Sequence, residues 1–353
     1  SAAFVIYAAA VDPWAWLVMR ILVGFCFSGV YVAAESWLNN AATNETRGQT
    51  LSAYLICQLG GIVLAQALLG VADPAGYDLF ILMSVVVSVA CAPILLSASP
   101  TPMVEAPRPM SIRELYVSSP LGAVGCFVLG MIFACMFGMT SVYGTEKGLS
   151  TGEISTLVGA IYLGGLLLQF PLGWISDRVD RRQLIAATTA VSALSAMSML
   201  AAGESFALLL AAAFFLGGTA NPLYSLFLAH TNDFLEVDQM PAAASGLVLL
   251  TGAGAAGTPV VVGFLMDAFG PAAFPTFMGT VMAAVTAYAL YRMTVRPSTP
   301  VDETLPYTPV TPAASAVAVE AAQSYYAEQA EQAADEADEE AAADDRTREE
   351  APS

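Results

Sequence analysis

Nine long apolar stretches, each nearly free of charge, follow one another along this chain, and a tenth, shorter one opens it. Crossing the ~30 Å hydrocarbon layer of a bilayer takes about 20 helical residues, which these stretches supply. Gly and Pro residues mark breaks at 12–13, 73–76, 147–148 and 270–271. The pattern predicts an all-α membrane protein with one partial and nine full transmembrane helices: 1–11, 14–38, 48–71, 77–97, 119–143, 153–175, 182–202, 205–230, 241–267 and 271–292.

The composition excludes a water-exposed surface. Charged residues make up 12% of the chain and hydrophobic residues 57%, whereas soluble domains average about 25% and 45–50%. The net charge of -18 is concentrated at one end, because fourteen Asp/Glu and only two Arg lie from Pro297 onward. We expect residues 297–353 to form an acidic, disordered tail that either keeps the protein soluble or binds a partner.

The positions of Arg and Lys predict the orientation in the membrane. Basic residues near helix ends stay in the cytoplasm, and acidic residues contribute little to this bias. Eight Arg residues lie in alternate gaps between the spans, and the other gaps hold only Lys147. The gaps after residues 38, 97, 175, 230 and 292 are therefore expected to be cytoplasmic, although the gap that begins at His230 carries no Arg or Lys.

Few side chains are suited to catalysis or metal binding. The chain has one His and five Cys, and none of the Cys forms a C-x-x-C pair. All five lie inside apolar spans, where we interpret them as packing residues. No H-E-x-x-H or G-x-S-x-G motif is present. We therefore expect no enzyme activity, no metal site, no cofactor and no nucleic-acid partner.

The segment from Gly173 to Arg182, GWISDRVDRR, joins two apolar spans through a short loop with three Arg residues. It resembles the loop motif of the major facilitator superfamily, G-x-L-A-D-R-x-G-R-K. The resemblance implies two pseudo-symmetric bundles of six helices joined by a cytoplasmic linker. It divides this chain into a partial first half, 1–97, a linker, 98–118, a complete second half, 119–296, and the tail, 297–353. About ten of the twelve helices are then present, and about two and a half helices are expected to precede Ser1.

In the superfamily this loop gates the cytoplasmic side of the transporter. The resemblance implies that Asp177 interacts with the helix that begins near Arg47, at its positive N-terminal end. One departure is that Asp180 replaces the usual Gly, which leaves open how tight the turn is. The alternative is that the charges serve only as a topology signal. The expected gating residues are Gly173, Asp177, Arg178, Arg181, Arg182 and Arg47.

A second set of polar residues lies within the spans themselves. Arg20 resembles the arginine of the family's fourth-helix motif, and it either faces the central cavity or snorkels to the outer surface. Unpaired polar groups are costly in hydrocarbon, so some of these side chains must face water, solute or one another. The cavity or coupling candidates are Arg20, Tyr31, Glu35, Gln58, Gln66, Tyr162, Gln169, Asn221 and Tyr224.

Small residues and one proline recur on the spans that the family uses for rocking. Glycines allow close helix contact, and a proline breaks the helix locally. These positions are either flexible hinges or sites of tight packing. The candidates are Gly24, Gly61, Gly254, Gly257 and Pro259.

Several strings, among them VAAESWLNN, RGQTLSAYL and HTNDFLE, resemble the YcaD-like branch of the superfamily. The resemblance, which ends near residue 296, implies a monomeric secondary transporter of the bacterial inner membrane. It would move a small solute by alternating access, with proton coupling as the usual mode. The alternative is a membrane sensor of the same fold that signals through its acidic tail.

Overall fold

The computed structural model describes residues 2–41, 47–68, 76–96, 110–235 and 239–295, together with Tyr307, Val310, Val319 and Ala322. Each span predicted from the sequence overlaps a helix of the described residues, and the span 119–143 overlaps three elements, α6, η1 and α7. The helices are α1 (Ala2–Ala9), α2 (Pro13–Ala41), α3 (Arg47–Leu68), α4 (Asp78–Leu96), α5 (Ile112–Ser118), α6 (Pro120–Phe133), η1 (Ala134–Met139), α7 (Thr140–Glu146), α8 (Thr151–Ser176), α9 (Arg181–Ala201), α10 (Phe206–Asn232), α11 (Met240–Phe269) and α12 (Ala273–Val295).

Seven helices of the described part are long and apolar enough to cross a membrane: α2, the run of α6, η1 and α7, and each helix from α8 to α12. The run from α6 to α7 contains one feature that the apolar pattern did not predict, a π-helical turn over Ala134–Met139. Such turns widen the helix locally. The short α5, in the expected linker, begins with a capping box in which Ser111 and Glu114 bond to each other's backbone N–H.

Local sequence signals explain where these helices start and stop. α8 begins at a second capping box, formed by Ser150 and Glu153. α11 ends before Gly270, whose φ of 78° is in the left-handed region that Gly adopts without strain. Gly148, with a φ of 79°, makes the turn between α7 and α8 in the same way.

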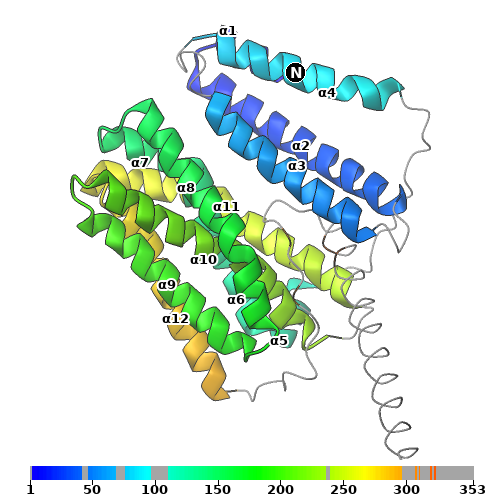
Figure 1. The fold of residues 1–353 in the computed structure, drawn as a ribbon, viewed down its shortest axis with the longest axis vertical. Coiled ribbons are helices and arrows are strands. Elements are labelled where there is room, and N and C mark those ends of the chain that lie inside the picture. The colour runs from blue at the N-terminus through cyan, green and yellow to red at the C-terminus, as the bar shows by residue number, and fades with distance from the viewer. Residues whose placement is uncertain are drawn as a thin grey trace, which may run out of the picture.

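The helices form two groups (Figure 1). In the first, α1 contacts α2 and α4. In the second, α10 lies at the centre and contacts α6, α8 and α9, while α12 packs on α9 and α11 packs on α6. The two groups meet where α3 contacts α8. We call α5–α12 the C-terminal group and α1–α4 the N-terminal group.

Glycines let two helix pairs of the C-terminal group approach backbone to backbone. A Cβ on Gly164 of α8 would lie 2.0 Å from the Phe214 carbonyl oxygen, and one on Gly217 of α10 would lie 2.1 Å from that of Ile161. On α6 and α11, Gly130 and Gly254 are in contact with the facing backbone at the same close range. Small residues of this kind stabilise helix pairs in lipid, where the hydrophobic effect between helices is absent.

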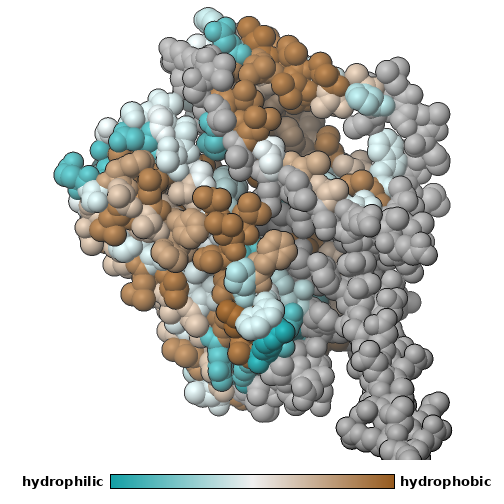
Figure 2. All heavy atoms as spheres, in the orientation of Figure 1, coloured by the Kyte–Doolittle hydropathy of each residue, from teal (hydrophilic) through white to brown (hydrophobic). Residues whose placement is uncertain are grey.

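The outer faces of the helices are apolar. In Figure 2, hydrophobic residues cover much of the visible face, and hydrophilic residues gather toward the helix ends. Large apolar side chains such as Phe25 on α2, Leu194 on α9 and Phe264 on α11 are at least 70% exposed. Exposed apolar surface of this extent marks contact with a membrane. The protein is a multi-pass integral membrane protein.

Candidate functional site: the charged end of the C-terminal group

A cluster of charged residues of the C-terminal group, including all its described Arg residues after Arg113, lies at the end of the helices where α8, α10 and α12 finish and α6, α9 and α11 begin. We call this the charged end and define it by Asp177, Arg178, Asp180, Arg181, Arg182, His230, Asp233 and Arg292. This is the end that the Arg pattern assigns to the cytoplasm. It contains four of the six expected gating residues, and a fifth, Gly173, lies one turn before Asp177 on α8.

The loop between α8 and α9 is short and is held by backbone hydrogen bonds. The Asp177 N–H donates to the Gly173 carbonyl at 3.2 Å, and the Arg178 N–H donates to that of Ile175 at 3.0 Å. Asp180 is the N-cap of α9 and accepts from the Arg182 N–H at 2.9 Å. Asp180 has a φ of -56°. The loop therefore turns without the glycine that the family motif has at this position, which answers the question raised by that departure.

Arg181 connects the loop to the end of α10. Its guanidinium forms an ion pair and hydrogen bond with Asp233, and it also lies 3.7 Å from Asp177 Oδ1. Further hydrogen bonds reach Ser176 Oγ at 3.3 Å and the Ala229 carbonyl at 3.4 Å. The Arg181 and Asp233 side chains are only 2% and 4% exposed. Buried charges persist only when they are paired, so this pair fixes the start of α9 against the end of α10.

Arg182 and Asp180 form a second pair beside the first. The guanidinium donates from Nε to Oδ1 at 3.2 Å and from Nη2 to Oδ2 at 2.8 Å. Burial by itself would raise the pKa of Asp180. The hydrogen bonds from the Arg182 side chain and backbone, with the charge of Arg182 and a smaller contribution from His230, hold that pKa below its usual range.

Arg178 has a different environment and remains exposed. Its guanidinium lies over the Trp174 ring, with Cζ 4.0 Å from the ring centroid, and Nη1 donates to the Trp174 carbonyl at 2.9 Å. Both contacts are to Trp174, in the last turn of the preceding helix, α8. Arg181 therefore bridges to α10, whereas these contacts of Arg178 are with Trp174 of α8.

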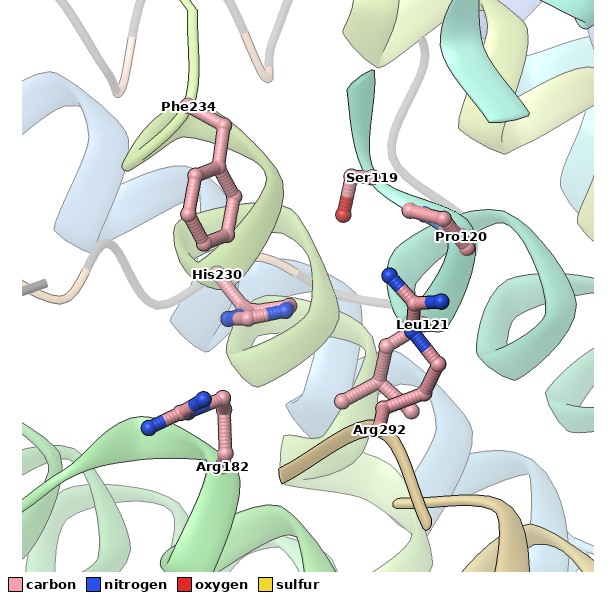
Figure 3. Close-up of a pocket in the computed structure, with 7 residues that line it drawn as sticks. All are labelled: Ser119, Pro120, Leu121, Arg182, His230, Phe234 and Arg292. Atoms are coloured by element: carbon pink, nitrogen blue, oxygen red, sulfur yellow. The ribbon is translucent and has the colours of Figure 1, made fainter. Parts of the chain in front are cut away.

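A small pocket opens beside Arg182 at the charged end (Figure 3). Its wall combines the first residues of α6 with basic side chains from three other helices, Arg182, His230 and Arg292. The His230 ring packs edge-on against Phe234, with centroids 5.1 Å apart. Because Asp180 is bonded to the Arg182 guanidinium, part of the positive charge at this pocket is already neutralised.

Asp177 has a partner that the sequence did not reveal. Its Oδ1 accepts a hydrogen bond from the backbone N–H of Tyr307 at 2.7 Å. The Tyr307 ring lies against Gly173, where a Cβ would come within 2.5 Å of Tyr307 Cδ1. The expected contact of Asp177 with the start of α3 is not tested, because the Arg47 side chain lies outside the described residues.

The polar candidates of the N-terminal group fall into two environments. Glu35 on α2 is 3% exposed and accepts a hydrogen bond from the Tyr54 hydroxyl of α3 at 2.5 Å. Tyr31, one turn away, is half-buried, as are Gln58 and Gln66 of α3. Arg20 is exposed on α2. The buried Glu35 carboxylate therefore lies near the C-terminal end of α2. Arg20 lies about four helical turns away, toward the N-terminal end of the same helix.

The polar candidates of the C-terminal group lie along α8 and α10. The Tyr162 ring stacks on Phe137, with centroids 5.0 Å apart. The Asn221 amide donates to the Gly217 carbonyl at 2.8 Å and packs at Gly165, where a Cβ would lie 2.7 Å from it. Tyr224 is 1% exposed, and its hydroxyl has no hydrogen-bond partner among the described residues. Gln169 is half-buried.

The hinge candidates also separate into two kinds. A Cβ on Gly254 would lie 1.9 Å from the Phe127 carbonyl oxygen, so this glycine is a packing contact between α11 and α6. Gly24, Gly61 and Gly257 have no atom within 4 Å of such a Cβ. α11 runs unbroken through Pro259 from Met240 to Phe269.

Small hydroxyl side chains also pair between helices, at positions that no motif in the sequence marks. Ser192 of α9 and Thr219 of α10 are 2.7 Å apart, and Thr286 of α12 donates to Thr189 of α9 at 2.9 Å. At the charged end, Thr231 of α10 donates to Ser119 at 3.1 Å. Ser and Thr are common in spans, and no local signal distinguishes those that bond between helices.

Comparisons with known proteins agree with this architecture. The sequence model of the Major Facilitator Superfamily matches the chain over residues 1–156 and 123–323, which extends past Arg296, where the recognisable motifs end. An uncharacterized MFS-type transporter of Yersinia pestis (strain Pestoides F) is 25% identical over 261 residues, which is 73% of this chain and 67% of that protein.

Two further relatives have the same kind of name. An uncharacterized MFS-type transporter of Yersinia enterocolitica is 27% identical over 266 residues, covering 74% of this chain and 68% of the relative. The uncharacterized MFS-type transporter YcaD of Escherichia coli O6:K15:H31 is 25% identical over 258 residues, covering 72% and 66%. This chain thus spans about two thirds of the length of its relatives. The resemblance to the YcaD-like branch is confirmed, and the chain belongs to the Major Facilitator Superfamily.

Proposed function

We propose that the protein is a secondary active transporter that moves a small solute across the bacterial inner membrane by alternating access, with protons as the coupling ion. Family membership and the names of the relatives support membrane transport. In this proposal the charged end of the C-terminal group faces the cytoplasm, as the Arg pattern predicts. The protein acts as a monomer, because in this family one chain supplies both bundles.

The packing of the helices favours alternating access. The C-terminal group is held together by the glycine contacts of α8 with α10 and of α6 with α11, and by the Arg181–Asp233 pair. In the N-terminal group α1 packs on α2 and α4, while α3 is bonded to α2 through Tyr54 and Glu35 and packs on α8 of the C-terminal group. Rocking of one bundle against the other requires each bundle to move as a unit, with the solute site between them.

The single observation that carries the coupling proposal is the Glu35–Tyr54 hydrogen bond. A carboxyl group within a transmembrane segment is costly and marks proton relays or ion pathways. Glu35 is 3% exposed, and its carboxylate is bonded across the α2–α3 contact. Protonation of Glu35 would remove its negative charge. Release of that proton would restore the carboxylate, which is a strong acceptor for the Tyr54 hydroxyl.

Flux measured in proteoliposomes tests this proposal. The full-length protein is reconstituted with the pH-sensitive dye pyranine inside, and a panel of sugars, amino acids, organic acids and cationic drugs is added outside. We expect at least one class to acidify the lumen with the wild type, and Glu35→Gln to abolish this acidification. Asp78→Asn is the control, because Asp78 is an exposed acid in the first turn of α4. Proton movement by Glu35→Gln at the wild-type rate would exclude Glu35 as the coupling residue.

Asp177 is the residue that we propose closes the cytoplasmic side. In that role its carboxylate engages the start of α3, near Arg47, while the outward-open form is populated. Asp177→Asn is expected to lower flux with little change in membrane expression. If this variant transports solute at the wild-type rate, the charges of the loop serve only as a topology signal.

A further inference from the structure

The pocket beside Arg182 is lined by three basic side chains and by no acidic one. Figure 3 shows these side chains, Arg182 of α9, His230 of α10 and Arg292 of α12, around one space that the start of α6 also faces. Four helices of the C-terminal group therefore meet at a site whose wall carries positive charge and no negative charge.

The charge of Arg292 is not balanced by a carboxylate of the described residues. Arg181 and Arg182, at the same end, are each bonded to a carboxylate, whereas Arg292 is half-buried and forms no such ion pair within the described part of the chain. The acidic tail, which is expected to be disordered, lies outside that part except at four positions. Arg292 is in the last turn of α12, where the helix dipole offsets only about half an elementary charge. A guanidinium that is partly removed from water favours a bound anion.

The start of α6 adds a backbone donor to the pocket. Ser119 caps this helix and accepts from the Gly122 N–H at 3.3 Å, and Pro120 has no N–H. The N–H of Leu121, in the same first turn, has no acceptor within its helix, and the described residues provide none. Leu121 is 1% exposed. Buried N–H groups without a partner are rare, and those at a helix start point out of its positive end, where anions bind.

The size of the pocket favours one kind of anion. Its enclosed part has room for about one water-sized group. A single oxygen of a phosphate group fits such a space, and the other oxygens then lie at the mouth of the pocket. The planar guanidinium of Arg292 binds two oxygens of a phosphate at once. The pocket therefore suits a phosphate group that enters by one oxygen.

The membrane-facing surface extends to this pocket. Val117, two residues before the α6 cap, is 70% exposed, and Tyr291, next to Arg292 on α12, is 59% exposed. Exposed apolar side chains in these positions contact lipid chains. Basic pockets between transmembrane helices bind the headgroups of anionic lipids. The phosphate of a lipid can thus reach the mouth of the pocket, as can a soluble phosphate.

We propose that this pocket is a binding site for a phosphate group, held by the Arg292 guanidinium and the Leu121 N–H. The group is supplied either by the headgroup of an anionic phospholipid or by a soluble phosphate compound. Its binding links the end of α12 to the start of α6. The site does not depend on the proposed transport function, so each of the two can fail without the other.

Thermal denaturation of the full-length protein in a neutral detergent tests the site. The probes are inorganic phosphate, glycerol 3-phosphate and dioleoylphosphatidylglycerol, each titrated at constant ionic strength. Dioleoylphosphatidylcholine is the control lipid, because its headgroup has no net charge. A compound that binds only the folded protein raises the Tm as its concentration passes the Kd. We expect at least one anionic probe to raise the wild-type Tm by about 5 °C at 100 times its Kd.

Two charge-matched variants separate the pocket from the rest of the charged end. Arg292→Gln removes the charge at the pocket. Arg178→Gln is the control, because Arg178 is an exposed arginine of the same end that does not line the pocket. We expect Arg292→Gln to weaken binding of the anionic probe about tenfold or more, the effect of losing one hydrogen bond between charged groups. Arg178→Gln should change the affinity less than about twofold.

A third variant serves if Arg292→Gln is not monodisperse. Arg292→Lys keeps the charge in the last turn of α12, but its ammonium lacks the planar fork that binds two oxygens. We expect this variant to weaken binding as well, by a smaller factor than Arg292→Gln. Wild-type affinity in Arg292→Lys, with Arg292→Gln misfolded, would contradict the role of the guanidinium.

The probes also identify the source of the phosphate. A rise in Tm with phosphatidylglycerol alone assigns the site to a lipid headgroup, and a rise with inorganic phosphate or glycerol 3-phosphate assigns it to soluble phosphates. Either result supports the site. The proposal is wrong if no anionic probe raises the wild-type Tm, or if phosphatidylcholine raises it equally. An equal loss of affinity in Arg292→Gln and Arg178→Gln would also overturn it, because general attraction to the charged end would then explain the binding.

Discussion

Breaking the Arg181–Asp233 pair should destabilise the C-terminal group more than any other single change at the charged end. Both side chains are almost fully buried, at 2% and 4% exposure. Removing one partner of a buried pair costs about 3–5 kcal/mol, because the other charge stays desolvated. Asp233 is also the C-cap of α10, where the helix dipole disfavours an acidic group. We therefore expect the loss of stability in Arg181→Met to lie in the upper part of this range.

Replacing Asp233 instead of Arg181 should cost less stability. In Asp233→Leu the Arg181 guanidinium keeps Asp177 at 3.7 Å, Ser176 at 3.3 Å and the Ala229 carbonyl at 3.4 Å. We expect a loss of about 1.5–3 kcal/mol, typical of a hydrogen bond to a charged group. The double variant Arg181→Met/Asp233→Leu should recover most of the loss, because an apolar pair has no charge to desolvate.

The assay is thermal denaturation of the full-length protein, fused to a fluorescent protein and followed by size-exclusion chromatography after heating. A loss of 3 kcal/mol corresponds to a decrease in Tm of roughly 6–12 °C, at 2–4 °C per kcal/mol. The order expected from lowest to highest Tm is Arg181→Met, Asp233→Leu, double variant and wild type. Losses that simply add in the double variant would refute the idea that the two charges stabilise each other.

Three further predictions address single features. Asp180→Asn keeps the N-cap but removes the charge. The folded-state pKa of Asp180 is lowered, so its carboxylate stabilises the folded protein above the unfolded-state pKa of about 4. This stabilisation is lost as pH falls through the folded-state pKa. The Tm gap between wild type and this variant should therefore narrow below about pH 4, and a gap independent of pH would contradict the Arg182 pairing. Gly254→Ala should destabilise by about 1–3 kcal/mol through contact with the Phe127 carbonyl. Its control, Gly257→Ala on the same helix, has open space and should be neutral or slightly stabilising; equal Tm values for the two would show that Gly254 is not a packing site. Gln183→Cys in intact cells should react only with a membrane-permeant reagent, and labelling by an impermeant one would reverse the orientation. Ser176 is unsuitable for this test because it is 1% exposed.

The sequence by itself determined the features that depend on neighbouring residues. Helix positions follow from long apolar runs, and helix ends follow from caps and glycines such as Ser150, Glu153 and Gly270. The charged loop from Gly173 to Arg182 was recognisable because its spacing is local. The family assignment followed from this loop together with the number of spans.

Only the tertiary structure decided which of these residues meet. Arg181 pairs with Asp233, 52 residues away, and Asp177 accepts from Tyr307, 130 residues away. Asn221 packs at Gly165, and Gly254 is a contact with α6. No periodicity in the chain encodes such pairs, because they depend on how helices far apart in sequence are oriented and spaced. In a chain where apolar residues fill every face of the spans, hydrophobic pattern shows that a helix is in the membrane but not which side faces its neighbour.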